Sequence, residues 1–415
     1  MSTRREHYLI NFKYPAFTEE SGSFCRRIRF IEGDILLTST NEKFRMSPRT
    51  RVTFGLHEGT WPADADLFVP SDWVSLRQGS RGLVAEMELL SPCLRERATP
   101  LPSVEVIREW NVFLGAVRKF FERREFLEVQ TPTLVTCPGT EPHLEAFSTH
   151  FQRGRENRKF FLPTSPELHL KKLVAAGYGP LFEIRPCFRN GEVSAHHQPE
   201  FWMLEWYRPG QTLEAIEKDC RDLVKVCAKA LSVQGPERTI RCSMPELFKG
   251  HLGLTLTPRT SAEELIAKAR ELALHLSLPC DFDDAFYLLF LEKIEPKIDP
   301  KPLLFLRDYP PSQAALARLT NEGWGDRFEM YWRGMELANG YHELNDPVVQ
   351  KERSREDLRK QKALGKEPVA LDEDFFQALE SGMPPTAGIA LGLERLFLAL
   401  TERNSLADLR LFPIQ

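Results

Sequence analysis

The N-terminal part of the chain alternates short apolar runs with turn-forming residues. Such runs, bounded by Gly, Asp, Asn and Ser, are typical of β-strands. We expect strands at residues 27–31, 35–37, 51–55 and 83–90, and a small β-barrel over residues 1–98. A Pro-punctuated segment at residues 97–103 is suited to a linker. We therefore predict a second domain over residues 99–415.

The second domain opens with a helical pattern. Apolar side chains recur at Ile107, Trp110, Phe113, Leu114 and Val117. This spacing of three and four residues is that of an amphipathic helix. The pattern predicts a long helix from about residue 106.

Helices and strands then follow in irregular order. Further helices are expected at residues 166–176 and 213–231, and from Ser261, which forms a capping-box pattern with Glu264. A strand is expected at residues 126–132, where Pro132 favours an edge position because it cannot donate to a β-ladder. The regular rhythm of a doubly wound fold is missing, so we predict an α+β fold with an antiparallel sheet.

Composition narrows the class of protein. The chain has 415 residues, of which 42% are hydrophobic and 27% charged, which is ordinary for a globular protein. No apolar run is long enough to suggest a membrane span, so we expect a cytoplasmic protein. Eight cysteines lack metal-ligand spacing, and a net charge of −4 makes no case for nucleic acid by itself.

Residues 182–207 read as a strand, a polar loop and a second strand. With a period of two, Phe201, Met203, Glu205 and Tyr207 share one face of the second strand. Arg185, Cys187 and Arg189 likewise share one face of the first strand. An ordinary hairpin with a salt-bridged surface is the alternative.

Residues 328–343 form a second candidate hairpin. If Arg333 and Gly334 make a two-residue turn, Glu336 pairs with Tyr331 and shares a face with Glu329. Two carboxylates on one face suit Mg²⁺, which proteins hold through one or two carboxylates plus substrate phosphates. Asn339, Tyr341 and Glu343 have the opposite parity and would join this face only through a bulge, which Gly340 would permit. An edge hairpin with solvated glutamates is the alternative.

Two weaker signals complete the pattern. Residues 387–395 are a small-residue strand that runs into a helix and ends at Arg395, which indicates close approach of a ligand or tight helix packing. Glu167 lies in the first turn of a helix, where the helix dipole alone would favour a carboxylate.

Taken together, these segments resemble the three ordered motifs of class II aminoacyl-tRNA synthetases. The long helix with residues 128–132 resembles motif 1, residues 188–205 motif 2 and residues 388–395 motif 3. Residues 165–167, 199–207 and 338–345 resemble the lysine branch, over about residues 103–415. The resemblance implies a six- or seven-stranded antiparallel sheet flanked by helices, a homodimer built on motif 1, and ATP and Mg²⁺ as co-reactants.

The resemblance also implies roles for particular residues. Arg189 would hold the α-phosphate of ATP, Phe201 and Arg395 would sandwich the adenine, and Arg189 and Arg395 would be the catalytic residues. Glu329 and Glu336 would bind Mg²⁺, and Glu343 would receive the side-chain ammonium of the substrate. The remaining ATP contacts would be Asn190, Gly191, Glu192, Gln198, Glu336, Leu337 and Gly392, and the amino-acid pocket would contain Ser165, Pro166, Glu167, Glu205, Tyr207, Asn339, Tyr341, Glu343 and Ala390.

Within the lysine branch, the chain is most similar to truncated ligases that attach (R)-β-lysine to a lysine of elongation factor P. Ser165 and Ala390 stand where lysyl-tRNA synthetases usually carry Ala and Gly. Lysine or (R)-β-lysine is therefore the expected substrate, activated as an adenylate with release of pyrophosphate, and elongation factor P the expected acceptor. A lysine–tRNA ligase acting on tRNA(Lys) and a catalytically silent paralogue are the alternatives.

The chain departs from both patterns in two places. In motif 2, Gly191 stands where Glu is usual, Glu192 follows it, and Gln198 replaces a usual Asn. Either the loop is shifted by one residue or the adenine contact is altered. The N-terminal part resembles a reduced oligonucleotide-binding barrel, which the truncated ligases lack. Residues 1–98 carry 14 Lys and Arg against 13 Asp and Glu, which does not help the tRNA alternative.

Overall fold

The structure is a computed structural model. It describes residues 23–32, 35–38, 43–46, 50–54, 57–60, 72–78, 84–91, 102–276, 280–314, 316–367 and 369–412. The chain divides into two compact units, Met1–Arg108 and Glu109–Gln415. The predicted boundary between residues 98 and 99 lies outside the described residues and stays a prediction.

The first unit is a seven-stranded sheet in the order β3-β2-β1-β6-β7-β4-β5. The four predicted strands correspond to β1, β2, β4 and β7, and Val52, Val74, Leu76 and Met87 are buried on it. Closure of this sheet into a barrel stays a prediction. The bounds are β1 Ser23–Glu32, β2 Ile35–Thr38, β3 Lys43–Arg45, β4 Arg51–Phe54, β5 His57–Thr60, β6 Trp73–Gln78 and β7 Val84–Ser91.

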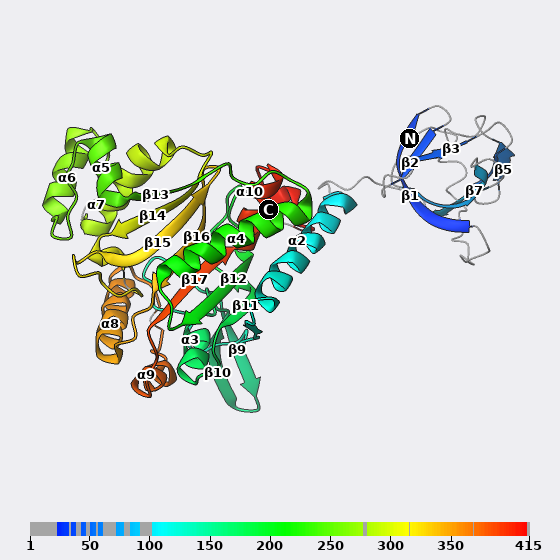
Figure 1. Ribbon diagram of the computed structural model, residues 1–415. Helices are drawn as coiled ribbons and strands as arrows, with labels where there is room; N and C mark the ends of the chain where they lie inside the picture. The colour runs from blue at the N-terminus through cyan, green and yellow to red at the C-terminus, as the bar shows by residue number, and fades with distance from the viewer. Residues whose placement is uncertain are drawn as a thin grey trace. The chain divides into compact units, whose positions relative to one another are not determined.

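The second unit is built on an eight-stranded sheet in the order β13-β14-β15-β16-β17-β12-β11-β8 (Figure 1). The six strands from β14 to β11 are antiparallel, as predicted, but both edge strands, β13 and β8, pair in parallel. The sheet is therefore mixed and has one strand more than the resemblance implied. Its strands are β8 Leu127–Glu128, β11 Leu181–Phe188, β12 Glu200–Pro209, β13 Thr239–Ser243, β14 Leu303–Tyr309, β15 Gly325–Trp332, β16 Met335–His342 and β17 Thr386–Gly392, and a separate hairpin is formed by β9 Ser148–Arg153 and β10 Glu156–Phe161.

The helices confirm the periodicities in the sequence. The long opening helix is α2 (Val104–Glu122), and α6 begins with the predicted capping box, in which the Ser261 side chain accepts from the backbone N–H of Glu264. Among the described residues, no helix is long and apolar enough to cross a membrane. The other helices are α3 Glu167–Ala175, α4 Leu213–Leu231, α5 Met244–Leu252, α6 Ala262–Glu271, α7 Phe282–Leu289, α8 Pro347–Ala363, α9 Glu373–Glu380 and α10 Leu393–Thr401.

Helices α2, α4 and α10 pack on one face of the sheet and bury its apolar side chains. Phe121 of α2 stacks on Phe182 of β11, with ring centroids 4.6 Å apart, and also contacts Trp206 of β12. Alternate residues of the same strands point the other way. The opposite face of β11, β12, β16 and β17 is thereby left for polar side chains.

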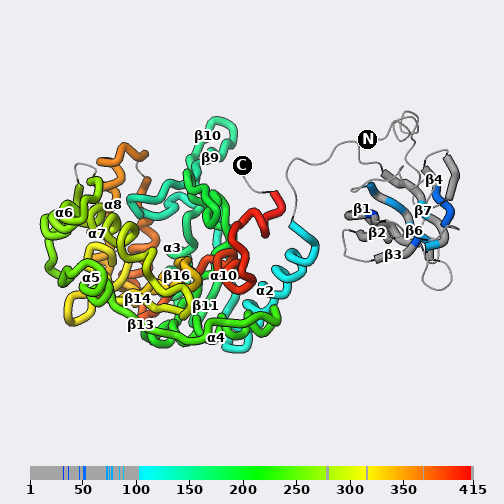
Figure 2. The backbone as a smooth tube through the Cα atoms, turned by 90° about the horizontal axis from the view of Figure 1, so that it is seen from above, coloured from blue at the N-terminus to red at the C-terminus, as the bar shows by residue number. Residues whose placement is uncertain are grey.

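A helical cluster covers one end of the sheet. Helices α5, α6 and α7 gather beside β13 and β14, as both views show (Figure 2). Met244, Phe248 and Leu265 are wholly buried there, and Phe248 stacks on Phe286. This cluster has its own apolar core, to which Leu304, Leu306 and Tyr331 of the sheet contribute.

A buried carboxylate ties α4 to the sheet edge. Glu217 is fully buried and accepts hydrogen bonds from Arg241 Nε at 2.7 Å and from Arg307 Nε at 2.6 Å. Removing this buried charge is costly because the charge-assisted hydrogen bonds from two guanidinium groups are replaced by weaker ones to a neutral group.

We expect Glu217→Gln to lower the free energy of unfolding by about 2–3 kcal/mol, as measured by urea denaturation. The control is Glu214→Gln, whose carboxylate also pairs with Arg307, at 3.0 Å, but is 57% exposed. Its loss should cost no more than about 1 kcal/mol. Equal changes in the two variants would contradict this account.

Candidate active site

The register of three strands, β16, β17 and β12, creates a shallow floor on the polar face of the sheet. Asn339 of β16 pairs with Ala390 of β17, which pairs with Glu205 of β12. Directly opposite residues share a face, so Ala390 leaves space between Asn339 and Glu205. One row further along, Gly388 lies in the same way between Tyr341 and Tyr207.

No side chain can be added at Gly388. A Cβ atom there would collide with Glu343 Oε1 and would lie 2.5 Å from Tyr207 Cε1. Glycine is therefore required here by close approach of neighbouring side chains.

A bulge in β16 brings the second hairpin into register with this floor. Arg333 and Gly334 form the predicted two-residue turn with φ angles of 52° and 73°, and Tyr331 pairs with Glu336. The next pair is Met330 with Ala338, so Leu337 is the extra residue. Glu336 and Asn339 consequently lie on the same face as Glu329.

The predicted position of the bulge, Gly340, was wrong. Gly340 pairs regularly with Phe328 and Ile389. A Cβ atom on Gly340 would lie 2.7 Å from Cζ of Phe328, so this glycine makes room for an aromatic ring. The need for a bulge could be inferred from parity, whereas its location depends on which side chains must pack.

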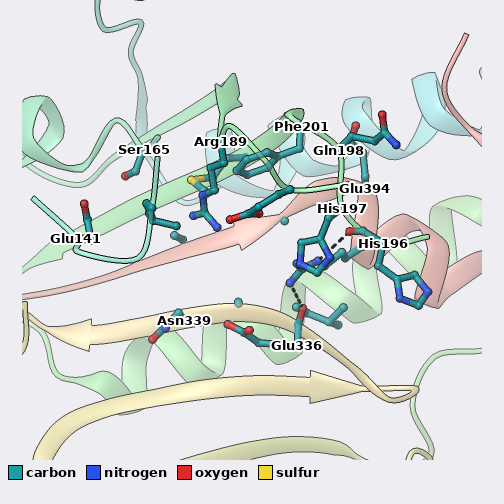
Figure 3. Close-up of a pocket in the computed structure, with 18 of the residues that line it drawn as sticks. Glu141, Ser165, Arg189, His196, His197, Gln198, Phe201, Glu336, Asn339 and Glu394 are labelled. Carbon is teal, nitrogen blue, oxygen red and sulfur yellow. Dashed lines mark hydrogen bonds between the residues drawn. The ribbon is translucent and has the colours of Figure 1, made fainter. Parts of the chain in front are cut away.

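A cavity of about 250 Å³ lies over this floor (Figure 3). Glu336 and Asn339 on β16 face Arg189 and Phe201 across it. The predicted residues that line it are Ser165, Glu167, Arg189, Glu192, Gln198, Phe201, Glu336, Leu337, Asn339, Tyr341, Ala390, Gly392 and Arg395.

Seven predicted residues do not line this cavity: Pro166, Asn190, Gly191, Glu205, Tyr207, Glu329 and Glu343. Glu205, Tyr207 and Glu343 are buried against the lining residues, as described below. Asn190 turns away, since its Nδ2 donates to Glu145 Oε1 at 2.7 Å.

Glu205 is buried at the side of the floor, and two hydroxyl groups donate hydrogen bonds to its carboxylate. Ser165 Oγ donates to one carboxylate oxygen at 2.6 Å and Tyr207 Oη to the other at 3.2 Å. Burial, with repulsion from Glu167, raises the pKa of Glu205 to about 8. A cation that enters the pocket stabilises the ionised form of this carboxylate.

Lys171 is a buried cation that sequence reasoning missed. Its side chain is fully buried on α3 and forms ion pairs with Glu167 and, at 2.6 Å, with Glu343. Burial lowers the pKa of Lys171, but the two carboxylates more than offset this and raise it overall. The sequence could have indicated the pairing of Lys171 with Glu167, because the two residues are one helical turn apart.

Even with Lys171, this end of the cavity has more carboxyl groups than cationic groups. Glu167 and Glu343 share the buried ammonium of Lys171, whereas Glu205 accepts from hydroxyl groups. Burial raises the pKa of Glu343, although Lys171 opposes this rise. A buried carboxylate without a counter-ion is unfavourable. The arrangement therefore suits a ligand that carries more than one ammonium group.

The other end of the cavity is cationic and aromatic. The Arg189 guanidinium lies over the Phe201 ring, 5.0 Å from its centroid, and Arg189 Nε is buried without a hydrogen-bond partner among the described residues. Arg395 Nη1 donates to the carbonyl of Glu336 at 2.9 Å, which fixes its guanidinium beside β16. A flat ring and an anionic group would both find partners here.

His197, also missed by sequence reasoning, holds Arg395 in place. The guanidinium is always a donor, so His197 Nε2 must accept from Arg395 Nη2. Nδ1 then donates to Ser194 Oγ at 2.8 Å. Burial, together with the charge of Arg395, lowers the pKa of His197, so the ring is kept neutral.

Of the two predicted magnesium ligands, Glu336 lines the cavity and Glu329 does not. Burial, reinforced by Glu329, raises the pKa of Glu336 to about 7, so a nearby cation would stabilise its ionised form. Glu329 is held by Arg327 and by Tyr331 Oη, which donates to it at 2.9 Å. In the described ranges no group of three acidic, His or Cys residues could hold a metal alone, so phosphate oxygens would be needed as well.

The motif 2 departure resolves as a shift of one residue. Gly191 has a φ of 79° and does not line the cavity, whereas Glu192 does. Positive φ favours glycine, so Gly191 serves the turn and the carboxylate follows it. Glu141, His196 and Leu316 also line the cavity, and no periodicity marked any of them because they lie in loops. Leu406, in the short 3₁₀ helix Leu406–Asp408, lines it as well.

Comparison with known proteins agrees with this geometry. The family profile of class II tRNA synthetases (D, K and N) matches residues 103–415. Several relatives bear the name elongation factor P--(R)-beta-lysine ligase. The protein of Vibrio parahaemolyticus is 37% identical over 320 residues, which are 76% of this chain and 97% of the relative. That of Salmonella gallinarum is 36% identical over 329 residues, 77% of this chain and 99% of the relative.

A third relative of that name, from Hamiltonella defensa, is 36% identical over 309 residues, 72% of this chain and 92% of the relative. The matches thus span nearly the whole of each relative. Three ordered motifs, the sheet that carries them and these matches lead to one conclusion: the chain belongs to the class II tRNA synthetases of the D, K and N family.

Proposed function

We propose that this chain activates lysine or (R)-β-lysine with ATP and transfers it to a lysine side chain of elongation factor P. The observation that carries the proposal is a buried cluster of carboxylates directly beside a cationic, aromatic cavity. The first suits a diammonium amino acid and the second suits ATP. The names of the relatives, which cover most of this chain, support the same reaction and acceptor.

The amino acid binds over the floor formed by Gly388 and Ala390. Its side-chain ammonium is paired with Glu343, whose Oε1 points over Gly388, and its other ammonium with Glu167 and Glu205. Tyr207, Tyr341 and Asn339 border this space, and Pro166 begins the helix that carries Glu167. Ser165 and Ala390 add a hydroxyl and a methyl group where a displaced amino group has to fit.

ATP binds at the other end. Arg189 contacts the α-phosphate, while Phe201 and Arg395 hold the adenine between them. Glu192, Gln198, Leu337 and Gly392 line the same space, and Asn190 and Gly191 shape the loop. Bound Mg²⁺, held by Glu329 and Glu336 with the phosphates, supplies positive charge that offsets the charge of the leaving pyrophosphate.

Activation needs no protein nucleophile. The substrate carboxylate attacks the α-phosphorus, the bond to the pyrophosphate oxygen breaks, and an aminoacyl-adenylate remains. Arg189 and Arg395 stabilise the charge that develops on the phosphorus oxygens, and the floor residues hold the carboxylate in line. The enzyme is an ATP-dependent ligase that releases pyrophosphate and then AMP.

Elongation factor P and tRNA(Lys) are the two candidate acceptors. Residues 1–102 lie outside the family match at residues 103–415, which keeps a tRNA(Lys) acceptor as the second candidate. Residues 1–98 are nearly balanced in charge, which disfavours it. We propose further that the chain acts in the cytoplasm as a homodimer built on α2, where Val112 is 48% exposed.

Pyrophosphate exchange tests activation. We expect the chain to exchange pyrophosphate into ATP in the presence of (R)-β-lysine, more weakly with α-lysine, and then to label elongation factor P. Label on tRNA(Lys) instead would assign the chain to the tRNA ligases. Absence of exchange with both isomers would make it a silent paralogue.

Ala390 tests how isomers are distinguished. Ala390→Gly removes one methyl group between Asn339 and Glu205, and we expect the ratio of kcat/KM for (R)-β-lysine over α-lysine to fall about tenfold. Ala387→Gly is the matched control because Ala387 lies on the same strand but on the opposite face. An unchanged ratio in Ala390→Gly would contradict the role of the methyl group.

Substrate binding should release protons. Glu205 has a pKa of about 8, so below that pH it is largely protonated in the free protein. An entering ammonium favours the ionised form and lowers this pKa, so affinity should rise as pH increases from about 6 to 8, by up to about tenfold per pH unit. Calorimetry in two buffers of different ionisation enthalpy measures the release. Binding without proton release would show that this carboxylate is already ionised.

A further inference from the structure

Glu141 occupies a junction between cavities. It lines the active-site cavity, a small adjoining cavity beside Glu167 and a larger cavity of about 660 Å³. Among the described residues, it is the one side chain common to all three. The loop that carries it, residues 138–142, lies between β8 and β9.

The larger cavity offers a separate route to the reacting atoms. It shares only Glu141 and Leu144 with the active-site cavity, and it is bordered by the hairpin side chains Ser148 and Phe161 and by Lys366 and Glu367 after α8. Once an aminoacyl-adenylate has formed, the active-site cavity is filled. An acceptor amine that arrives through the larger cavity then reaches Glu141, the ionisable side chain that both cavities share.

No side chain of the described ranges pairs with the Glu141 carboxylate. Its neighbours are instead two acids and one base: Glu167 from α3, Asp357 from α8 and Arg189 after β11. Asp357 is itself engaged by Thr140, whose Oγ1 donates to it at 3.3 Å. The Lys366 ammonium, which is close to this loop, donates to the carbonyl oxygens of Pro142 and Leu144. Glu141 is thus left available to a ligand.

We infer that Glu141 removes the proton from the acceptor's lysine ammonium at the point where the larger cavity meets the active site. This inference rests on the proposed function. The ammonium gives one proton to the Glu141 carboxylate, and the free amine attacks the carbonyl carbon of the adenylate. The C–N bond forms, the C–O bond to phosphate breaks, and AMP leaves with the electron pair. The second proton on nitrogen passes to the AMP phosphate or to water.

The electrostatics of the site are consistent with this role. Burial, reinforced by Glu167 and Asp357 and opposed by Arg189, raises the pKa of Glu141 to about 7. A carboxylate with that pKa is a far better proton acceptor at neutral pH than an ordinary surface glutamate. The first half-reaction needs no base, so the role is confined to transfer.

A competition between two acceptors tests the inference. Hydroxylamine is an uncharged nucleophile at neutral pH and needs no base, whereas a lysine side chain does. With the full chain, elongation factor P and hydroxylamine present together, we expect Glu141→Gln to lower the ratio of protein amide to hydroxamate about a hundredfold. The ratio cancels any effect on adenylate formation, and hydroxamate formation shows that the variant is folded.

Glu367→Gln is the control. Glu367 borders the same larger cavity, but its carboxylate is 70% exposed and pairs with Lys159. The ratio of protein amide to hydroxamate in Glu367→Gln should match that of the wild type. In single turnovers, the wild-type rate of amide formation should rise with pH and level off above about 7, whereas the Glu141→Gln rate should continue to rise as water deprotonates the amine.

The outcomes separate this inference from the proposed function. An unchanged ratio in Glu141→Gln, or equal loss of both products, would overturn the role of Glu141 while leaving activation intact. If the wild type forms neither hydroxamate nor pyrophosphate-exchange product, the proposed function itself fails.

Discussion

The site depends on keeping several carboxylates in a place where water cannot solvate them. Such burial is unfavourable unless counter-charges and donors are held in position. Lys171, Ser165 and Tyr207 provide part of that compensation from within the chain. The carboxyl groups that still lack a cationic partner are the basis for recognising a substrate with two ammonium groups.

The sheet makes this arrangement possible by separating two environments. Helices α2, α4 and α10 take the apolar residues of alternate positions, and the positions between them point to the cavity. The bulge at Leu337 is the exception that aligns both halves of β16 with the same cavity. Without it, either Glu336 or Asn339 would be turned into the helical layer.

Much of this could be predicted from the sequence, and the limits have physical reasons. The helices α2, α4 and α6, the Arg333–Gly334 turn and the pairing of Tyr331 with Glu336 follow from local patterns. The parallel edge strands do not, because β8 and β13 pair with segments far along the chain. The existence of the bulge could be inferred, but the prediction placed it at Gly340. That glycine instead makes room for the ring of Phe328.

Site residues likewise divide into those that the sequence predicted and those that only the fold brings together. Among residues on strands, Glu205 follows from parity, Asn339 required a bulge as well, and Ala390 was assigned from the family resemblance. Glu141 and His197 lie in loops whose conformation depends on distant contacts, such as that between His197 and Arg395. Lys171 was overlooked for a different reason, because a lysine on a helix is ordinarily solvated, and only the fold shows that this one is enclosed.

The glycine floor has a consequence for the range of substrates that variants of this protein could accept. At Gly388 the pocket already ends at the backbone, with Glu343 and Tyr207 packed against it. A side chain added there would displace Glu343 or Tyr207, while Ala390 has a single methyl group to give up. Redesign of this floor therefore has little room in either direction, and a change in substrate length would have to come from the side chains around it.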